Sequence, residues 1–481
     1  MVKCNDYLPL NYVRMLNLSL ELKVLYCSKE QSKMSLKSSL AKAAGKSSYW
    51  FLHTFLKGGS SLPGKITTKI DPDILETLGR DYDVIMITGT NGKTLTTALT
   101  VQVLKQKYEN ILTNPSGSNM EQGIVTTFLR AKKSRNQRPL AVLEVDEANI
   151  VKITKYIKPK AFVFTNIFRD QMDRYGEIYT TYQKILNGVA LAPNATIIAN
   201  GDAPIFHSKQ LPNPMVYYGF DDQEESDIKA SPNTDGVLCP NCQHILHYKF
   251  ISYSNLGKYF CPNCGYSRPE LNFALNKRIE LTPKSSTFEI DGEQIKIGIG
   301  GVYNIYNALA AYSVGRFMGV SPAQTRKAFE QDEHIFGRQE EINVNGKEVT
   351  LILVKNPVGL NQVIDMISTD KDEFSFIGLL NANYADGIDT SWIWDGDFER
   401  LPKMNIKQFI TGGERYKDIT YRLQVAGVDP AKHLVEPDLD KVVEMINDTP
   451  TKKVYILATY TAMLSLRKTF AAKGYIKGGM D

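Results

Sequence analysis

The sequence lacks any apolar run of the ~18 residues that a membrane-spanning helix needs. Its beginning also lacks a continuous apolar stretch followed by a small-residue cleavage site, so we expect no secretory signal. No basic run is present, and 57 Lys and Arg against 52 Asp and Glu give a net charge of only +5, which argues against a nucleic-acid-binding tail. These absences predict a cytoplasmic protein that binds no nucleic acid.

Cysteine is scarce, with six in 481 residues. Four of them form the pattern C-x2-C-x18-C-x2-C: Cys239, Cys242, Cys261 and Cys264. This spacing is typical of two knuckles that close one tetrahedral zinc site, and four thiolates leave no open position for catalysis. We therefore predict a structural zinc ribbon inserted over residues 236–270. The remaining Cys4 and Cys27 are unassigned, and His244 and His247 are expected to be surface residues.

The length favours several domains, since ~150 residues per domain gives about three. Short β-rich runs alternate with helical stretches in two regions, which predicts parallel α/β sheets. The runs are 83–88, 140–145, 161–167 and 196–200 in the first region, and 349–354, 374–380, 408–413 and 454–459 in the second. We predict one domain over residues 34–330 and a second over 331–481. Residues 1–33 are expected to be an extension upstream of a true start at Met34.

A lysine-rich segment near the start is predicted to be helical. From Lys37 to Lys57, the lysines share this helix with Trp50, Phe51 and Phe55. Such a helix either packs on its own domain, which we expect, or lies on a membrane surface. The sequence leaves both interpretations open.

A glycine-rich loop follows the first predicted strand. Residues 88–94 read TGTNGKT, directly before apolar residues at helical spacing. In such a loop the backbone N–H groups turn toward a phosphate, the lysine contacts the phosphates, and the threonine hydroxyl binds Mg²⁺. The following helix directs its positive end to the anion. We therefore predict a Mg²⁺-nucleotide site formed by Gly89, Thr90, Asn91, Gly92, Lys93 and Thr94.

An acidic cluster lies at the end of the strand predicted over residues 140–145. The segment LEVDEA supplies Glu144, Asp146 and Glu147. A carboxylate at a neighbouring strand end would complete the site, because Mg²⁺ prefers oxygen ligands. For any one of these residues, a solvated acidic loop is the alternative.

Six motifs occur together in the order and spacing seen in Mur ligases and folylpolyglutamate synthases. They are TGTNGKT (88–94), EVDE (144–147), TNIFRDQMDRYGE (165–177), NGD (200–202), GGVYNIYNALAA (300–311) and GR (337–338). With the four cysteines, residues 34–481 resemble the MurT family, the synthetase subunits of lipid II isoglutaminyl synthase. The resemblance implies an α/β fold with a Mur-ligase-type central P-loop ATPase domain, an inserted zinc ribbon and a C-terminal Rossmann-like domain.

The resemblance also implies roles for single residues. Lys93 would contact phosphate, and Thr94 and Glu144 would hold Mg²⁺. Three further residues would line the nucleotide site: Asn166, Asn304 and Arg338. A strand cap, a helix cap and a surface ion pair are their respective alternatives.

The sequence departs from the Mur-ligase pattern in two places. Mur ligases usually carry His where this chain has Gln171 and Tyr303, which argues against the lysine-carbamate or second-metal arrangement of amino-acid-adding members. The segment LVKNP at 353–357 offers no acid to the nucleotide ribose. Lys355 is instead a candidate for contact with phosphate or acyl phosphate.

Members of the family activate a carboxylate with ATP, and a nitrogen nucleophile then attacks the acyl phosphate. The resemblance specifies the α-carboxyl of D-glutamate in the lipid II stem peptide as the acceptor, ammonia as the nucleophile and D-isoglutamine as the product. Mg²⁺, Lys93 and Arg338 would stabilise the charge on the transferring phosphoryl group. Contact with the inner face of the membrane would come through the lipid-linked substrate.

The chain is not expected to hydrolyse glutamine itself. That reaction uses a nucleophilic cysteine with a histidine, whereas four cysteines are assigned to zinc and the other two lie upstream of residue 34. The resemblance implies a glutaminase partner, the GatD subunit. Segment 381–399 is expected to dock it, and Asp389 to complete its Cys–His pair. A helix-capping role for Asp389, with Trp392 and Trp394 buried, is the alternative.

Two other functions agree with parts of the sequence. One is an amino-acid-adding ligase of the Mur or folylpolyglutamate synthase type, against which Gln171 and the zinc insertion argue. The other is a zinc-ribbon nucleotide switch that binds nucleic acid or protein without ligation. That function would leave the C-terminal α/β domain without a use.

Overall fold

The computed structural model describes residues 36–55, 61–114, 118–131, 138–170, 177–230, 235–331 and 339–476. Several sequence predictions fall outside these ranges: those on residues 1–33, with Cys4 and Cys27, and those on Gln171 and Arg338. The chain divides into two compact units. One comprises the described residues of Met1–Asp81 and Met120–Lys133, and the other those of Tyr82–Asn119 and Ser134–Asp481.

The described part of the first unit is helical. Its helices are residues 36–55, α2 (Leu62–Ile70), α3 (Ile74–Gly79) and α5 (Glu121–Arg130). Helix 36–55 approaches α2 and α5 closely at Gly45, where a β-carbon would lie 2.1 Å from Thr67 Oγ1 and 2.7 Å from Leu129 Cδ1. A larger residue would force these helices apart. None of the helices that the structure describes, in either unit, is long and apolar enough to cross a membrane.

A nine-stranded sheet forms the first part of the second unit, in the order β12-β11-β10-β6-β5-β4-β1-β3-β2. Its strands are β1 (Asp83–Thr88), β2 (Leu112–Thr113), β3 (Leu140–Glu144), β4 (Ala161–Phe164), β5 (Thr196–Asn200), β6 (Met215–Phe220), β10 (Phe273–Leu281), β11 (Ser286–Ile290) and β12 (Glu293–Ile297). The pairs from β2 to β10 are parallel, and β10, β11 and β12 pair antiparallel. The central strands β1, β3 and β4 are buried along nearly their whole length, as expected when helices cover both faces.

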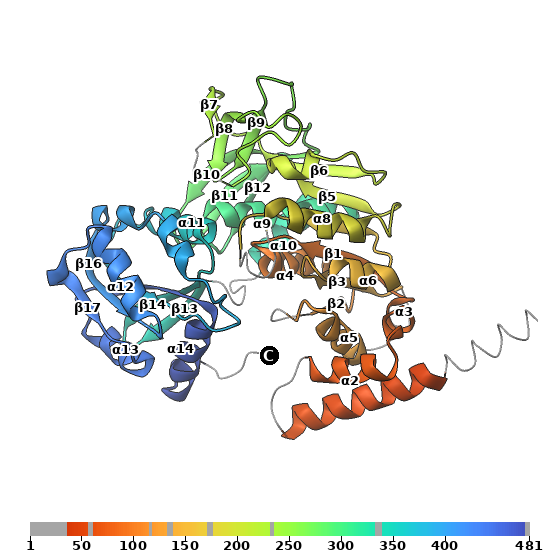
Figure 1. Ribbon diagram of the computed structural model, residues 1–481, viewed down its shortest axis with the longest axis horizontal. Helices are drawn as coiled ribbons and strands as arrows, with labels where there is room; N and C mark the ends of the chain where they lie inside the picture. Colours follow the sequence, from red (N-terminus) through yellow and green to blue (C-terminus); the bar gives the residue numbers. More distant parts are fainter. Residues whose placement is uncertain are drawn as a thin grey trace, which may run out of the picture. The chain divides into compact units, whose positions relative to one another are not determined.

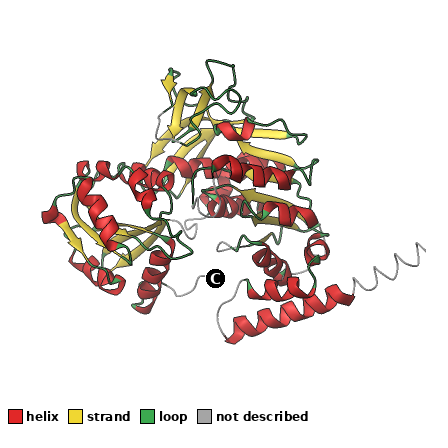
Figure 2. Ribbon diagram, viewed as in Figure 1, coloured by secondary structure: helices red, strands yellow, loops and turns green. Residues whose placement is uncertain are grey.

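Helices pack on this sheet in two groups (Figures 1 and 2). They are α4 (Lys93–Leu104), α9 (Val302–Phe317) and α10 (Pro322–Glu330), which contact one another, and the pair α6 (Ile150–Tyr156) and α8 (Ile178–Val189). From β1, the chain crosses to β2 at one edge of the sheet. From β3, it crosses in the opposite direction to β4, which lies on the other side of β1. Because such crossovers are right-handed, α4 and α6 lie on opposite faces. The carboxyl end of β1 is therefore a switch point, where α/β sheets bind ligands.

A three-stranded sheet is inserted between β6 and β10. Its strands are β7 (Ile228–Lys229), β8 (His247–Tyr253) and β9 (Leu256–Phe260). The segment that follows β9 is anchored to the large sheet by Arg268, whose guanidinium is 2.9 Å from the fully buried Asp202. Tyr306 of α9 donates to the same carboxylate at 2.7 Å. Asp202 thus joins the insertion, the sheet and α9.

A six-stranded sheet forms the C-terminal part, in the order β13-β14-β18-β15-β16-β17. Its elements are β13 (Gln339–Val344), β14 (Lys347–Leu353), α11 (Pro357–Ile367), β15 (Phe374–Leu379), β16 (Ile406–Gly412), α12 (Tyr416–Val425), β17 (His433–Val435), α13 (Leu439–Met445), β18 (Lys453–Ala458) and α14 (Tyr460–Ala472). Two core clusters lie on its two faces, one with α11 and α12 and the other with α13 and α14. The sheet is parallel except for the β13–β14 pair. This is the predicted Rossmann-like arrangement.

The predicted α/β fold is confirmed, with one local difference. The strand predicted over residues 161–167 ends at Phe164. Thr165 and Asn166 leave the sheet because their polar groups bond to the loop after β1: Thr165 Oγ1 donates to the Asn91 carbonyl at 2.9 Å. Apolar patterning alone does not reveal this contact.

Candidate active site

The loop after β1 takes a conformation that requires glycine. Gly89 and Gly92 have φ angles of 131° and 83°, and α4 begins at Lys93. A β-carbon on Gly92 would lie 2.0 Å from Asn307 Oδ1, and one on Gly89 would lie 2.3 Å from Thr165 Oγ1. The first N–H groups of a helix have no intrahelical acceptor and carry its positive end, so the loop favours an anion.

The loop is fixed from the neighbouring strand by Asn166. The Asn91 N–H donates to Asn166 Oδ1 at 2.8 Å, and the Thr90 N–H donates to the Asn166 carbonyl at 2.8 Å. Asn304, in the first turn of α9, donates to the Gly300 carbonyl at 2.6 Å. The structure thus places Asn166 on the loop itself, whereas the contacts of Asn304 lie within the start of its own helix.

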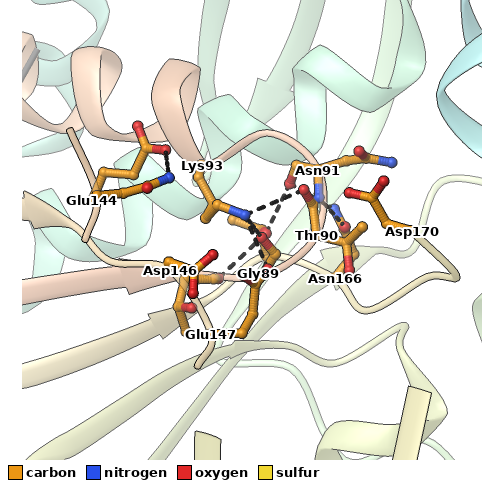
Figure 3. A network of polar contacts seen from close by, with 12 residues as sticks. Gly89, Thr90, Asn91, Lys93, Glu144, Asp146, Glu147, Asn166 and Asp170 are labelled. Carbon is orange, nitrogen blue, oxygen red and sulfur yellow. Dashed lines mark hydrogen bonds and ion pairs between the residues drawn. The ribbon is translucent and has the colours of Figure 1, made fainter. Parts of the chain in front are cut away.

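Lys93 lies buried among carboxylates. Its ammonium is 2.9 Å from Glu147 Oε1 and donates to the Gly89 carbonyl at 2.5 Å (Figure 3). Burial disfavours the charged ammonium, but Glu147, Glu144 and Asp146 outweigh it, so the pKa of Lys93 is raised above its ordinary value. Lys93 is therefore a fixed cation at the loop.

The three acids at the carboxyl end of β3 differ in their contacts. Asp146 Oδ1 accepts from the Ala148 N–H at 3.1 Å and so shapes the turn, and Glu147 binds Lys93. Glu144 Oε1 accepts from Asn119 at 3.0 Å, whereas Glu144 Oε2 is buried without a hydrogen-bond partner. Of these three acids, only Glu144 thus has an unsatisfied buried oxygen. An oxygen of this kind suits a hard cation such as Mg²⁺.

The C-terminal part reaches the same loop through residues after β14. The Lys355 ammonium pairs with Asp170 and lies 3.4 Å from the Thr90 carbonyl. The side-chain amides of Asn356 and Asn91 exchange two hydrogen bonds, of 3.0 and 3.3 Å. Lys355 therefore lies beside the loop, as its predicted phosphate contact requires.

Three residues at this loop were not predicted from the sequence: Asp170, Asn307 and Asn356. Asp170 and Asn307 fall in two of the six motifs, and Asn356 falls in the segment at 353–357, but nothing in the sequence distinguishes these side chains from their neighbours. Asn307 accepts from Thr96 of α4 at 3.2 Å, and Asp170 Oδ1 is a second buried oxygen without a partner.

Asp389 lies in a different part of the fold, after β15. It is exposed, and its Oδ1 accepts from the Ser391 N–H at 2.8 Å at the start of the short helix η2 (Ser391–Asp395). The hydroxyl and N–H of Ser391 lower the pKa of Asp389. Asp389 thus contacts the first residue of η2 from outside the helix, whose N-cap residue is Thr390 and has no side-chain capping bond. Trp394 is 48% exposed, so the alternative of buried tryptophans does not hold for it.

The structure brings the four cysteines of the insertion together, as predicted. The Sγ atoms of Cys239 and Cys264, and those of Cys242 and Cys261, are 3.5 Å apart, and all four lie within 4.8 Å of one another. A tetrahedron with Zn–S bonds of about 2.3 Å has edges of about 3.8 Å, whereas a disulfide bond is about 2.05 Å. The donor set and spacing therefore fit zinc. His247 instead pairs with Asp227 at 2.7 Å.

Comparison with known proteins first defines the class. Residues 87–315 match the Mur ligase middle domain, and residues 353–463 match the MurT ligase C-terminal domain. The solved structure of a pseudomurein peptide ligase type C from Methanothermus fervidus aligns with a TM-score of 0.64 at 19% identity, covering 84% of this chain and 81% of that chain. The fold is the Mur-ligase fold, and the chain is an ATP-dependent ligase.

Curated relatives then define the family. The lipid II isoglutaminyl synthase (glutamine-hydrolyzing) subunit MurT of Streptococcus pneumoniae is 50% identical over 448 residues, 93% of this chain and 100% of the relative. The subunit of the same name from Staphylococcus aureus strain COL is 35% identical, over 82% of this chain and 88% of the relative. The chain belongs to the MurT family. The roles of its single residues stay predictions.

Proposed function

We propose that this chain uses ATP to amidate the α-carboxyl of D-glutamate in the lipid II stem peptide, with ammonia from a glutaminase partner of the GatD type. The observation that carries the proposal is the loop at 88–94, where a buried lysine and the unpartnered oxygen of Glu144 flank a helix N-terminus. The 50% identity to a lipid II isoglutaminyl synthase subunit supports the substrate. The reaction would take place at the inner face of the membrane.

The loop would bind the triphosphate of ATP. Backbone N–H groups from Gly89 to Thr94 would contact the phosphates, and Lys93 would direct its ammonium to the transferring group. Thr94 and Glu144 would hold Mg²⁺, which would offset the negative charge of the phosphates. Asn166 would keep the loop in shape, and Asn304 would line the nucleotide site.

The chemistry divides into two balanced steps. A carboxylate oxygen of D-glutamate attacks the γ-phosphorus, the bond from that phosphorus to the β–γ bridging oxygen breaks, and ADP leaves. The nitrogen lone pair of ammonia then attacks the acyl carbon, the carbon–oxygen bond to phosphate breaks, and the nitrogen loses a proton. Lys93 and Arg338 would stabilise the phosphoryl charge, and Lys355, held by Asp170, would contact the acyl phosphate.

The partner would dock on the surface around Asp389. Large apolar side chains are exposed on this segment and on the neighbouring α12: Tyr384, Ile388, Trp394 and Tyr421. The rings of Trp394 and Tyr421 have centroids 6.0 Å apart, so the two elements share one surface. Exposed aromatic residues of this kind are enriched at protein interfaces. The lowered pKa keeps Asp389 ionised, as a carboxylate that orients a partner's histidine must be.

The four-cysteine site would hold a structural zinc. Its small sheet has a core of few residues, including Cys239, Leu246 and Tyr259. A metal that crosslinks both knuckles adds the stability that so small a core lacks. Four thiolate ligands leave no position for water, so no step of the reaction is assigned to it.

One assay tests the proposal. The purified chain is incubated with ATP, Mg²⁺, lipid II and ammonium, and the stem peptide is analysed by mass spectrometry. Replacement of one carboxyl OH by NH₂ is expected. A gain of a whole amino-acid residue would instead assign the chain to the amino-acid-adding ligases, and an unchanged peptide would refute both functions.

A further inference from the structure

The helix formed by residues 36–55 turns its small side chains inward. Ser38, Ala41 and Gly45 follow at spacings of three and four residues and are buried. Ser38 Oγ donates to Asp71 Oδ2 at 2.6 Å, and the close approach at Gly45 seats the helix on α2 and α5. This side of the helix is thus fully used by packing within its own unit.

The opposite side of the helix carries its large apolar residues. Five of them are 52 to 67% exposed: Leu36, Leu40, Trp50, Phe51 and Phe55. Leu36, Leu40 and Trp50 recur close to the helical repeat, so they lie on one side. An ordinary surface helix buries such residues and exposes polar ones. The reversed arrangement marks a binding surface, which we call the outer face.

The charged residues in the sequence of this helix and its flanks have one sign, apart from histidine. Between Glu30 and Asp71 the sequence contains no Asp or Glu, but it contains lysine at 33, 37, 42, 46, 57, 65 and 69. Helical geometry places Lys37 and Lys46 on the two borders of the outer face. Lysines at such borders extend their ammonium groups toward lipid phosphates while their methylenes cover apolar surface.

We propose that the outer face binds the surface of an anionic membrane, with Trp50 and Phe51 at the level of the lipid head groups. Aromatic residues prefer this interface, and the lysines complement anionic phospholipid. An anionic membrane offers negative charge over its whole surface, so it complements lysines on both borders of the outer face at once. This inference rests on the proposed function, in which the substrate is lipid-linked, and it adds a surface that would hold the chain at the membrane where that substrate lies.

Vesicle sedimentation tests the inference on the full chain. We expect binding to phosphatidylcholine vesicles that contain phosphatidylglycerol, and weaker binding to phosphatidylcholine alone. Replacing both Trp50 and Phe51 by serine should lower the partition coefficient by about tenfold or more. The matched control is Tyr179→Ser, which removes an exposed aromatic residue from α8 and should leave binding unchanged. The melting temperatures of both variants show whether they fold.

A second measurement keeps the test decisive if the double variant fails to fold. A chain with Trp392→Phe and Trp394→Phe retains Trp50 as its only tryptophan, and its emission should shift to the blue with the anionic vesicles. Absence of this shift, or equal binding by the Trp50→Ser Phe51→Ser chain, overturns the inference. The inference is also overturned if the parent chain is a dimer and the Trp50→Ser Phe51→Ser chain is a monomer, because the outer face would then bind a second copy.

Amidation of detergent-dispersed lipid II separates this inference from the proposed function. A chain that amidates the substrate but binds no vesicles contradicts only the membrane face. A chain that binds vesicles but makes no amide contradicts only the proposed reaction.

Discussion

Replacement of Lys93 by methionine would distinguish the chemical role of this residue from its structural one. The ammonium is 2.9 Å from Glu147, and the two side chains are only 10% and 6% exposed. Methionine keeps the apolar stem but leaves Glu147 without its ion-pair partner. Breaking a buried pair in this way costs about 3–5 kcal/mol, a large share of the ~5–15 kcal/mol that holds a typical protein folded.

The size of this loss can be checked with two further variants in urea unfolding. Adding Glu147→Gln to Lys93→Met removes the uncompensated charge and should restore more than half of the lost stability. Lys160→Met is the matched control, because Lys160 is 2.7 Å from Asp83 but 49% exposed. Arg138 also remains bound to that carboxylate. The control should lose less than about 1 kcal/mol.

The amidation activity of the Lys93→Met and Lys93→Met Glu147→Gln variants should not follow their free energies of unfolding. Removing one preorganised donor from a developing charge lowers kcat by about 10²–10³, and Glu147→Gln does not restore that donor. Amide formation with ammonium should therefore stay low in the double variant even after its stability recovers. Activity of Lys93→Met within about tenfold of the parent would contradict the chemical role of Lys93. A stability equal to that of Lys160→Met would contradict its role in a buried ion pair.

Three further predictions concern other parts of the chain. Asp389→Asn should leave ammonium-driven amidation intact and impair glutamine-driven amidation with the partner, whereas Asp395→Asn should affect neither; equal loss with both nitrogen sources would exclude the assigned role. Cys261→Ser should abolish bound zinc, measured by atomic absorption, and lower the melting temperature; an unchanged zinc content would remove the metal site. Burial lowers the pKa of His433 below 6.5, so the unfolded chain binds more protons than the folded chain just below that pH. The free energy of unfolding should therefore fall as the pH falls through this range, by at most about 1.4 kcal/mol per pH unit. His433→Gln should flatten this slope in urea unfolding, and an unchanged slope would contradict the assignment.

The sequence predicted those parts of the fold that depend on local patterning. Runs such as 83–88 and 196–200 became β1 and β5, because strands covered by helices on both faces are continuously apolar. The cysteines were equally predictable, since a metal site imposes its spacing on the chain. The end of β4 at Phe164 was not, because a tertiary contact to the loop decides it.

The candidate site divides in the same way. Lys93 and Glu144 were predicted because they lie in recognisable motifs at the carboxyl ends of strands. The pairing of Lys93 with Glu147 was not, since three acids follow one another and only the fold decides which oxygen faces the ammonium. Asn356 contacts Asn91 across 265 positions of the chain. A single sequence carries no signal for a contact at that separation.

The proposed reaction requires that the chain activates its substrate by phosphorylating a carboxyl group. The most direct measurement uses lipid II labelled with ¹⁸O in the α-carboxyl of D-glutamate, with ATP, Mg²⁺ and ammonium, and phosphorus NMR of the phosphate released. If an acyl phosphate forms, the phosphate carries one labelled oxygen from the substrate. Amide formation with unlabelled phosphate would contradict the claim.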